Sequence, residues 1–265
     1  MIKPGDRVCV GLSGGKDSSA LLLVLKKLAP KVGISRLVAA TLDEGISGYR
    51  EEAVRIAKSF AERLEVEHAV FSFGDLFGVE LDDIASASKR NLCSACGVLR
   101  RRALDIAARE AGCNVVATGH TREDNAQTLL MNVIRGEPQR LARTAPKTDG
   151  VEGFIPRIKP FSYTSERDVA LYAYLSGIAF QEKACPYRKD SLRLRVLTTL
   201  NKMENVRPNS HVALTRSIEK ARDGLIARSP RYPLERCAIC GYPSARMLCK
   251  VCQLAIELGF EAGRG

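Results

Sequence analysis

The sequence of 265 residues lacks the features that would attach a chain to a membrane or direct it out of the cell. Its first residues show no charged segment followed by an apolar one, and the apolar run at residues 20–25 is far too short to span a bilayer. Internal repeats and low-complexity tracts are also missing. We therefore expect a cytoplasmic protein that has no membrane partner.

Histidine is scarce in this sequence, with three residues, whereas cysteine occurs nine times. In a reducing compartment, cysteines are not expected to form a disulfide framework. Six of the nine form three Cys-x-x-Cys pairs, a spacing typical of metal sites. Because there are so few histidines, thiolates must supply most of the metal ligands. Cys9 and Cys113 lie in or beside predicted strands and are expected to be small core residues.

Acidic residues are outnumbered, since 41 lysines and arginines stand against 30 aspartates and glutamates, for a net charge of +11. A surface of this sign attracts polyanions, so nucleic acid is a stronger candidate partner than an acidic small molecule alone. The hydrophobic content of 45% is that of a globular protein. The length allows one sizeable α/β domain and a small appendage.

The stretch at residues 8–19 predicts a strand, a phosphate-binding loop and a helix. In its centre lies Ser-Gly-Gly-Lys-Asp-Ser, whose two glycines allow a tight turn that exposes N–H groups at a helix N-terminus, where phosphate is favoured. The spacing differs from that of the Walker loop, which needs Gly-x-x-x-x-Gly-Lys-Ser/Thr. The alternative interpretation is a glycine-rich turn with a capping serine.

Strands and helices alternate through the first two thirds of the sequence. Further strands are predicted at residues 36–42, 66–73 and 114–118, and helices at residues 51–64, 97–111 and 166–176. This alternation predicts an α/β fold with a parallel, Rossmann-like sheet and a ligand site at the carboxyl ends of its strands. The loops at residues 43–50 and 119–128 fall at that edge. In the second loop, Asp124 lies in the first helical turn, where it could bind Mg²⁺ or cap the backbone.

Several motifs together resemble those of the tRNA 2-thiouridine synthetases, the archaeal, thermophilic and eukaryotic cytosolic group of the PP-loop ATP pyrophosphatase superfamily. The resemblance runs from about Gly5 to the tail. It is carried by residues 13–18, the two loops named above, Cys93-Ser94-Ala95-Cys96-Gly97, Arg135-Gly136, Lys159-Pro160-Phe161, Tyr172-Ala173 and Cys185-Pro186-Tyr187. Members of that superfamily split ATP to AMP and pyrophosphate while adenylating a substrate. These thiolases commonly carry a second zinc module ahead of the PP-loop, and the printed sequence shows none there.

The resemblance implies a PP-loop (adenine nucleotide alpha hydrolase-like) fold with an ATP site. The phosphates would lie on Ser13, Gly14, Gly15, Lys16, Asp17 and Ser18 and near Gly119. The adenine would lie near Thr41. Lys16 and Arg100 would neutralise phosphate charge, and Asp17 or Asp124 would bind Mg²⁺.

Three further cysteines, Cys93, Cys96 and Cys185, are too few for a structural zinc site, which takes four protein ligands. A [4Fe–4S] cluster normally takes four cysteines as well, and with three of them one iron keeps an open position for sulfide or a substrate atom. The resembling thiolases are thought to use such a cluster. Two alternatives stay open: a persulfide on Cys93 or Cys185 with a transient disulfide, and a zinc knuckle that includes Cys93 and Cys96.

The last part of the sequence contains a double Cys-x-x-Cys motif. Four thiolates on two short knuckles complete a tetrahedral, structural Zn²⁺ site and can fold a segment that is too small for a core of its own. The expected ligands are Cys237, Cys240, Cys249 and Cys252. The second pair opens an apolar helix at residues 254–258.

Residues 191–226 form a predicted helical region that is rich in basic side chains. They are Arg193, Arg195, Lys202, Arg207, Arg216, Lys220 and Arg222. Such a run can be a solvated helix face or, as the resemblance favours, a surface that faces tRNA. We expect three parts: a PP-loop ATP-binding and catalytic domain (1–180), a basic helical region (181–230) and a zinc-ribbon-like module (231–265), with a linker at residues 227–233.

The predicted function is that of a tRNA sulfurtransferase. It would adenylate a tRNA uridine at C2 with ATP and replace the oxygen by sulfur, giving 2-thiouridine. The sulfur donor would be a thiocarboxylated ubiquitin-like protein or sulfide, and a homodimer is one possible assembly. The alternatives are cytidine 2-thiolation, lysidine-type ligation, and a zinc-bearing RNA-binding protein without catalytic activity.

Overall fold

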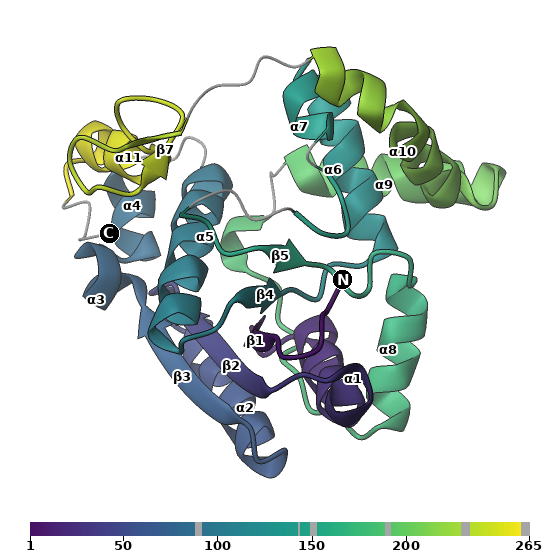
Figure 1. Ribbon diagram of the computed structural model, residues 1–265, viewed down its shortest axis with the longest axis horizontal. Coiled ribbons are helices and arrows are strands. Elements are labelled where there is room, and N and C mark those ends of the chain that lie inside the picture. Colours follow the sequence, from purple (N-terminus) through teal and green to yellow (C-terminus); the bar gives the residue numbers. More distant parts are fainter. Residues whose placement is uncertain (88–91, 143, 149–152, 189–191, 229–233, 261–265) are drawn as a thin grey trace.

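A parallel five-stranded sheet with strand order β3-β2-β1-β4-β5 forms the centre of the molecule (Figure 1). The structure is a computed structural model that describes residues 1–87, 92–142, 144–148, 153–188, 192–228 and 234–260. The strands are β1 (Arg7–Gly11), β2 (Arg36–Asp43), β3 (Glu67–Ser72), β4 (Val115–Ala117) and β5 (Arg157–Ile158). The predicted α/β fold with a parallel sheet is confirmed.

Helices cover both faces of the sheet, as expected for parallel strands joined by crossovers. On β1 the side chains alternate, so that Val8 and Val10 pack on one face and Cys9 on the other. The first face is covered by α1 (Lys16–Val32), α2 (Arg50–Arg63) and α8 (Glu166–Leu175). The second is covered by α3 (Phe73–Phe77), α4 (Leu81–Ala87) and α5 (Leu92–Glu110).

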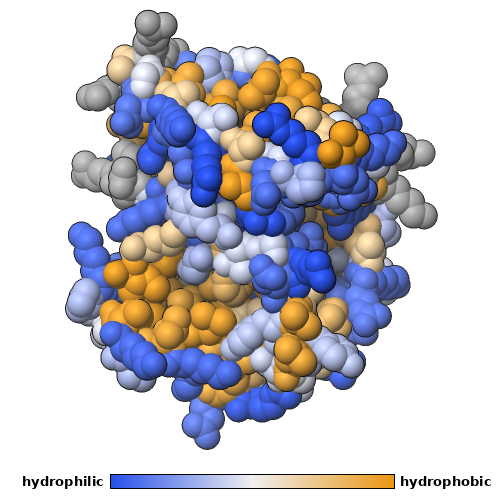
Figure 2. All heavy atoms as spheres, turned by 90° about the vertical axis from the view of Figure 1, so that its right-hand side faces the viewer, coloured by the Kyte–Doolittle hydropathy of each residue, from blue (hydrophilic) through white to orange (hydrophobic). Residues whose placement is uncertain are grey.

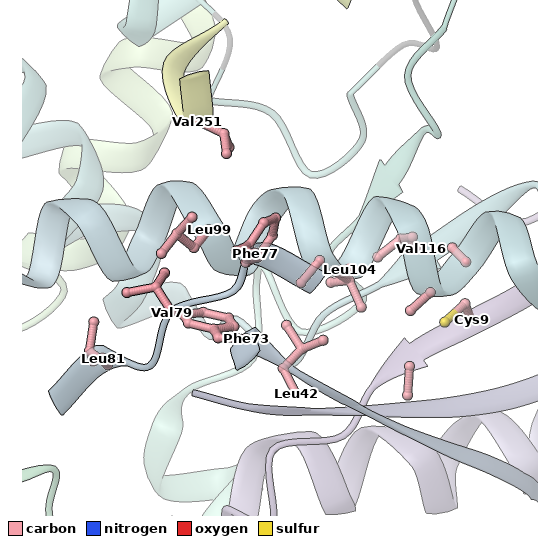
Figure 3. Close-up of a cluster of buried hydrophobic side chains, with 14 of the residues drawn as sticks. Cys9, Leu42, Phe73, Phe77, Val79, Leu81, Leu99, Leu104, Val116 and Val251 are labelled. Atoms are coloured by element: carbon pink, nitrogen blue, oxygen red, sulfur yellow. The ribbon is translucent and has the colours of Figure 1, made fainter. Parts of the chain in front are cut away.

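The core on the second face lies between α5 and the sheet (Figure 3). Phe73 and Phe77 pack edge to face, with ring centroids 5.6 Å apart, and share this core with Leu99 of α5. Cys9 is completely buried in this core, and Cys113 is nearly so, which confirms their prediction as small core residues. The core therefore fixes α5, the helix whose first turns carry Cys93 and Cys96.

A group of helices lies beside the β4–β5 edge: α6 (Arg122–Ile134), α7 (Pro138–Ala142), α9 (Leu192–Val206) and α10 (Ser210–Arg228). The predicted basic helical region is thus two helices, separated at Pro208 and at Asn209, whose φ of +69° cannot continue a helix. Both pack on α6, and α10 also packs on α7. The predicted linker at residues 227–233 overlaps the end of α10, and residues 229–233 lie outside the described residues.

One side of the molecule, to the right in Figure 1, combines α8 with α10. Figure 2 shows a hydrophobic area at the lower left of this side among hydrophilic residues. Leu28 of α1 and Leu171 and Leu175 of α8 are exposed hydrophobic residues. Within the described ranges, no helix is long and apolar enough to cross a membrane.

The C-terminal module consists of the antiparallel pair β6 (Glu235–Arg236) and β7 (Pro243–Ser244), followed by α11 (Lys250–Leu258). It packs on α5, and Val251 reaches the core there (Figure 3). The division of the chain at residues 180 and 230 stays a prediction. A short helix, η1 (Pro186–Arg188), directly follows Cys185.

Candidate active site and metal centres

The loop between β1 and α1 is shaped by its own serines. Ser18 Oγ accepts a hydrogen bond from Ser13 N (3.0 Å) and donates one to Gly15 O (3.0 Å). The residue that caps α1 is Gly15, which has no side chain that could do so. The first N–H groups of α1 therefore lack a side-chain cap and can bind an anion, as expected for a phosphate loop rather than a turn with a capping serine.

Close backbone contacts require glycine at two positions of this site. Gly14 has a φ of +80°, and a Cβ atom there would lie 2.4 Å from the carbonyl oxygen of Ala53 on α2. A Cβ atom on Gly119 would lie 2.8 Å from the carbonyl group of Asp17. These contacts place the loop between α2 and the segment that follows β4, and any larger residue would displace it.

Lys16 and Asp17 open α1 and face a third charged residue, Glu166 at the start of α8. Lys16 Nζ lies 2.7 Å from Glu166 Oε1 and 3.1 Å from Asp17 Oδ2. Burial alone would lower the pKa of Lys16, but the contacts with these two carboxylates raise it, so that the ammonium stays charged. The sequence analysis did not single out Glu166, because its partner Lys16 lies 150 residues away in the chain.

The carboxylate of Asp17 fits a cation. Its Oδ1 atom is buried and has no hydrogen-bond partner among the described residues. Burial raises the pKa of Asp17, Lys16 opposes this shift, and the charges of Glu166 and Asp124 add to it. An unpartnered oxygen in a cluster of carboxylates at a phosphate loop has the donor chemistry that Mg²⁺ prefers.

Asp124 adopts the capping geometry that the sequence left as one of two alternatives. Its Oδ2 atom accepts a hydrogen bond from Thr121 N (3.1 Å) at the start of α6. Its Oδ1 atom lies 3.6 Å from Arg193 Nη1 of α9. Lys159 follows β5 and donates to Asn125 Oδ1 (3.2 Å); burial lowers the pKa of Lys159, and the charge of Asp124 opposes this shift. Asp124 thus lies among cations, and its role as a Mg²⁺ ligand stays a prediction.

An ion cluster connects the phosphate loop with α5: Glu44 and Arg50 are buried in it, whereas the side chain of Arg100 is 49% exposed. Glu44, which is 4% exposed, lies 2.6 Å from Arg50 Nε and 3.1 Å from Arg100 Nε. Arg50 also donates to the carbonyl oxygens of Ser13 and Leu42. Arg100 therefore binds Glu44 at the edge of α5 that carries the cysteines, whereas the sequence predicted that it neutralises phosphate. The buried pair of Glu44 and Arg50 holds these loops in one arrangement, because removing one partner of a buried ion pair is costly.

Thr41 was predicted to lie near the adenine. The residue is fully buried, and its hydroxyl donates to Leu12 O (2.7 Å) and contacts His68 Nε2 (2.7 Å). Its side chain therefore connects the end of β2 with the loop after β1, and its place near the adenine stays a prediction.

The structure brings Cys93, Cys96 and Cys185 together. The first two lie three residues apart in the first turns of α5 and so share one face of the helix. Burial, opposed by Arg100 and supported by the charges of Glu44, Cys185 and Cys93, raises the pKa of Cys96 to about 12. Cys93 Sγ also lies 3.5 Å from the carbonyl oxygen of Tyr187, two residues after Cys185. The three thiols are near enough to affect one another's pKa, but their Sγ atoms do not all lie within 4.8 Å of one another as those of the tail do. Three thiols around the start of one helix fit a polynuclear cluster of metal ions better than a single ion.

The segment that carries Cys185 is attached to the phosphate loop. Gln181 N donates to Gly14 O (2.9 Å), and Gln181 Nε2 donates to Tyr49 O (2.6 Å). Lys183 Nζ donates to Gly48 O (2.7 Å). The three cysteines and the phosphate loop thus belong to one continuous site, a connection that the sequence alone did not predict.

The four cysteines of the tail form a second centre. All their Sγ atoms lie within 4.8 Å of one another, and the pairs Cys237–Cys252 and Cys240–Cys249 are each 3.6 Å apart. Burial would raise the pKa of Cys237, but N–H groups of Cys240 and Cys249 donate to its sulfur, and the pKa is lowered to about 6. Four converging thiols, one of them stabilised as a thiolate, fit a tetrahedral Zn²⁺ ion.

The module that carries these cysteines is held on α5 by a polar network. The guanidinium of Arg102 lies 3.3 Å from the ring centroid of Tyr242 and donates to Cys240 Sγ (3.6 Å). The Tyr242 hydroxyl donates to Asp105, which also binds Arg157 at 2.8 Å. Arg102 and Asp105 are buried charged residues that the sequence analysis did not single out.

Replacing Cys240 by serine is expected to remove zinc from the tail and destabilise it, since three thiolates no longer close the tetrahedral site. Iron bound by the other cysteines should remain, because the two centres share no ligand. The measurement is the zinc and iron content of protein purified without oxygen, with Cys113→Ser as the matched control. Loss of iron together with zinc would contradict the independence of the two centres.

Comparison with known proteins places this site in a family. A family model described as a PP-loop domain matches residues 2–204. The chain is 37% identical to the cytoplasmic tRNA 2-thiolation protein 1 of Xenopus laevis, over 96% of this chain and 74% of that protein. It is 39% identical to the protein of the same name from Bos taurus, over 100% of this chain and 77% of that protein.

A solved structure is similar over the whole chain. It is the U34-tRNA thiolase NcsA from Methanococcus maripaludis with its [4Fe-4S] cluster, with a TM-score of 0.84 and 32% sequence identity. The match covers 100% of this chain and 85% of that one. On the evidence of the family model, the relatives and this structure, the chain belongs to the PP-loop family of tRNA 2-thiolation proteins.

Proposed function

We propose that this chain is an ATP-dependent tRNA sulfurtransferase that converts a tRNA uridine to 2-thiouridine. The observation that carries this proposal is the continuity of the site, since the Cys185 segment binds the phosphate loop through Gln181 and Gly14. A nucleotide-activating loop next to three thiols is suited to a reaction that first activates an oxygen and then replaces it by sulfur.

The phosphate loop would carry out the activating step. The N–H groups at the start of α1 and the charged Lys16 would hold the phosphates of ATP, and Asp17 would bind Mg²⁺ through its unpartnered oxygen. Mg²⁺, when bound, neutralises phosphate charge. The O2 atom of the uracil then attacks the α-phosphorus, the bond to the bridging oxygen breaks, and pyrophosphate leaves. This step is necessary because oxygen bound to C2 is otherwise a poor leaving group.

The three cysteines would carry out the second step. Cys93, Cys96 and Cys185 would hold a [4Fe–4S] cluster, which with three protein ligands offers one iron position to a sulfur atom. Sulfide at this place would attack C2 of the uracil, the C2–O bond would break, and AMP would leave with the former uracil oxygen. Arg100, fixed by Glu44, keeps a positive charge beside the thiolates throughout.

The two partners of the reaction are tRNA and a sulfur donor. α9 and α10 expose basic side chains next to the site, which supports a tRNA-binding role for this surface. The donor would be sulfide itself or a ubiquitin-like protein with a C-terminal thiocarboxylate, as the resemblance in sequence implies. Both supply sulfur at the same oxidation level, so the reaction needs no external reductant.

The direct test is to incubate anaerobically purified protein with unmodified tRNA, ATP, Mg²⁺ and sulfide, and to digest the tRNA for mass spectrometry. We expect 2-thiouridine, and none when ATP is left out. A thiolated cytidine, or a nucleoside that has gained an amino acid, would instead identify one of the other PP-loop reactions.

The binding of tRNA is expected to depend strongly on salt, because Lys and Arg side chains that bind phosphates release counterions. Arg195 and Lys202 are exposed on α9 and Arg207 is exposed directly after it, whereas Arg193 turns inward to Asp124. Replacing the three exposed residues by glutamine should reduce the slope of log K against log[salt] by about 2 to 3. The measurement is fluorescence anisotropy with labelled tRNA between about 50 and 200 mM salt.

The matched control neutralises Lys26, Lys31 and Lys58, which are exposed on α1 and α2. These changes remove the same formal charge, but from helices at the other end of the molecule (Figure 1). An equal loss of slope in both triple variants would mean that tRNA responds only to net charge and does not bind at α9.

A further inference from the structure

A cavity of about 290 Å³ lies between α10 and the turn that joins β5 to α8. It is separate from the phosphate loop and from both groups of cysteines. Its lining residues come from the start of α6, from the turn and from α10: Arg122, Tyr163, Val212, Thr215, Arg216 and Glu219. Nothing in the reaction described above uses these side chains.

Tyr163 is the aromatic residue of this cavity and is 60% exposed. Its hydroxyl donates to Glu219 Oε1 (2.8 Å) on α10, which fixes the direction of the ring. A large aromatic side chain that is exposed and also held in place is suited to stacking against a planar ligand.

Two guanidinium groups border the same cavity. Arg216 forms no ion pair with any residue in the described part of the chain, and Arg122 has a buried Nε atom without a hydrogen-bond partner there. Guanidinium groups bind phosphates and the acceptor atoms of bases, and their planes stack on bases as well. The carboxylate of Glu219 and the hydroxyl of Thr215 add polar groups for the edge of a base. The combination fits a nucleotide whose base is not paired.

The cavity is connected to the phosphate loop by a short series of contacts. Arg122 Nη2 lies 3.1 Å from Glu123 Oε1, and Glu123 Oε2 accepts a hydrogen bond from Glu166 N (2.8 Å). Glu166 in turn binds Lys16 of the loop at 2.7 Å. A nucleotide in the cavity would therefore lie near the place where the target uridine meets ATP.

We propose that this cavity binds an unpaired nucleotide of the tRNA that lies close in sequence to the target uridine, with its base stacked on Tyr163. This inference rests on the proposed function, and it adds a site that fixes the position of the substrate. Its size, at the lower end of the roughly 300–1,000 Å³ typical of small-molecule sites, suits a single base better than a whole nucleoside triphosphate.

The test measures the affinity of the full chain for a fluorescein-labelled RNA stem-loop that contains the target uridine. Tyr163→Ala should weaken binding by about tenfold or more, since stacking of one base contributes about 5- to 150-fold in affinity. Tyr163→Phe keeps the ring and should bind within about twofold of the parent. Tyr174→Ala is the matched control, because this tyrosine is 77% exposed on α8 but does not line the cavity.

A second series uses stem-loops with one abasic position at each unpaired nucleotide of the loop. One abasic position should weaken binding to the parent protein by a factor similar to that of Tyr163→Ala, and should weaken binding to Tyr163→Ala by less than about twofold. Arg216→Glu is a second variant that should also weaken RNA binding, because it places a negative charge at the cavity. Since Arg216 is exposed, its replacement should not disturb folding.

Parent-like RNA affinity of both Tyr163→Ala and Arg216→Glu would overturn the inference. It would also be overturned if the two changes weakened the binding of ATP or AMP while RNA binding stayed unchanged, because the cavity would then take a free nucleotide. Failure of the proposed function gives a different result, since the parent protein itself would then fail to bind or thiolate tRNA.

Discussion

Replacing Asp17 by asparagine should reduce tRNA-dependent release of pyrophosphate from ATP by about a hundredfold or more. Asparagine keeps the shape of the side chain but removes the negative charge that a Mg²⁺ ion requires, and the loss of one group that stabilises the transition state typically costs 10²- to 10³-fold, as an order of magnitude. The unpartnered Oδ1 atom beside the phosphate loop is the observation behind this expectation.

The stability of this variant should not fall with its activity. Burial raises the pKa of Asp17, so its carboxylate is less stable in the folded protein than in the unfolded chain. At neutral pH the ionised group therefore lowers the free energy of unfolding, and a neutral residue should leave the melting temperature equal or slightly higher.

The measurement combines a coupled assay of pyrophosphate release with a thermal melt of each variant. Asp168→Asn is the matched control, because this aspartate lies exposed on α8 and contacts none of the loop residues. Pyrophosphate release by Asp17→Asn at the parent rate would mean that Asp17 does not act in the activating step.

Replacing Cys185 by alanine should abolish thiolation, with a loss of about a hundredfold or more, while pyrophosphate release stays within a fewfold of the parent. Replacing a residue that only contacts a metal ligand already lowers metal affinity or activity about 10- to 100-fold. Loss of a ligand itself should lower the activity at least as much. The activating step is preserved because the hydrogen bond that ties this segment to the loop is made by the backbone of Gln181 and not by Cys185.

Comparing the three cysteines separates the two sulfur mechanisms. With a cluster, Cys93→Ala, Cys96→Ala and Cys185→Ala should lose thiolation and iron about equally. With a persulfide on Cys93 or Cys185, Cys96→Ala should stay active, because Cys96 does not hold the transferred sulfur atom in that mechanism. Cys113→Ala, which changes a buried cysteine outside both centres, should lose neither thiolation nor iron.

The parts of the site that could be predicted from the sequence are those whose residues lie next to one another in the chain. The Ser-Gly-Gly-Lys-Asp-Ser loop occupies six consecutive residues after a strand, and each tail knuckle spans four residues. In both cases neighbouring residues alone determine the geometry, so their spacing carries the information. The parallel sheet follows in the same way from alternating apolar segments.

Contacts between distant residues could not be predicted in this way. The pairs Lys16–Glu166 and Glu44–Arg100 join residues far apart in sequence, and exposed charged residues elsewhere in the chain look the same. The ion pair of Arg100 with Glu44 was therefore not predicted, and the role of Arg100 at phosphate stays a prediction. The burial of Thr41 could not be predicted for a similar reason, because a threonine at the end of a strand gives no sign that its hydroxyl is used within the core. Its place near the adenine stays a prediction.

Some element boundaries also differed from the prediction. The helix that was expected to begin at residue 97 begins at Leu92. Gly97 was predicted as its first residue, but this glycine lies inside α5. As a result Cys93 and Cys96 lie on a helix and not in a loop before it. β5 has two residues and was not predicted, since a strand this short has no measurable alternation.

The relation between the two half-reactions is the most direct test of this account. The measurement follows pyrophosphate release and 2-thiouridine formation in one anaerobic reaction that contains tRNA, ATP, Mg²⁺ and sulfide. We predict that the parent protein releases about one pyrophosphate for each 2-thiouridine formed, and that Cys185→Ala releases pyrophosphate without forming thionucleoside. Formation of 2-thiouridine by Cys185→Ala at the parent rate, or by the parent protein without pyrophosphate release, would contradict the account.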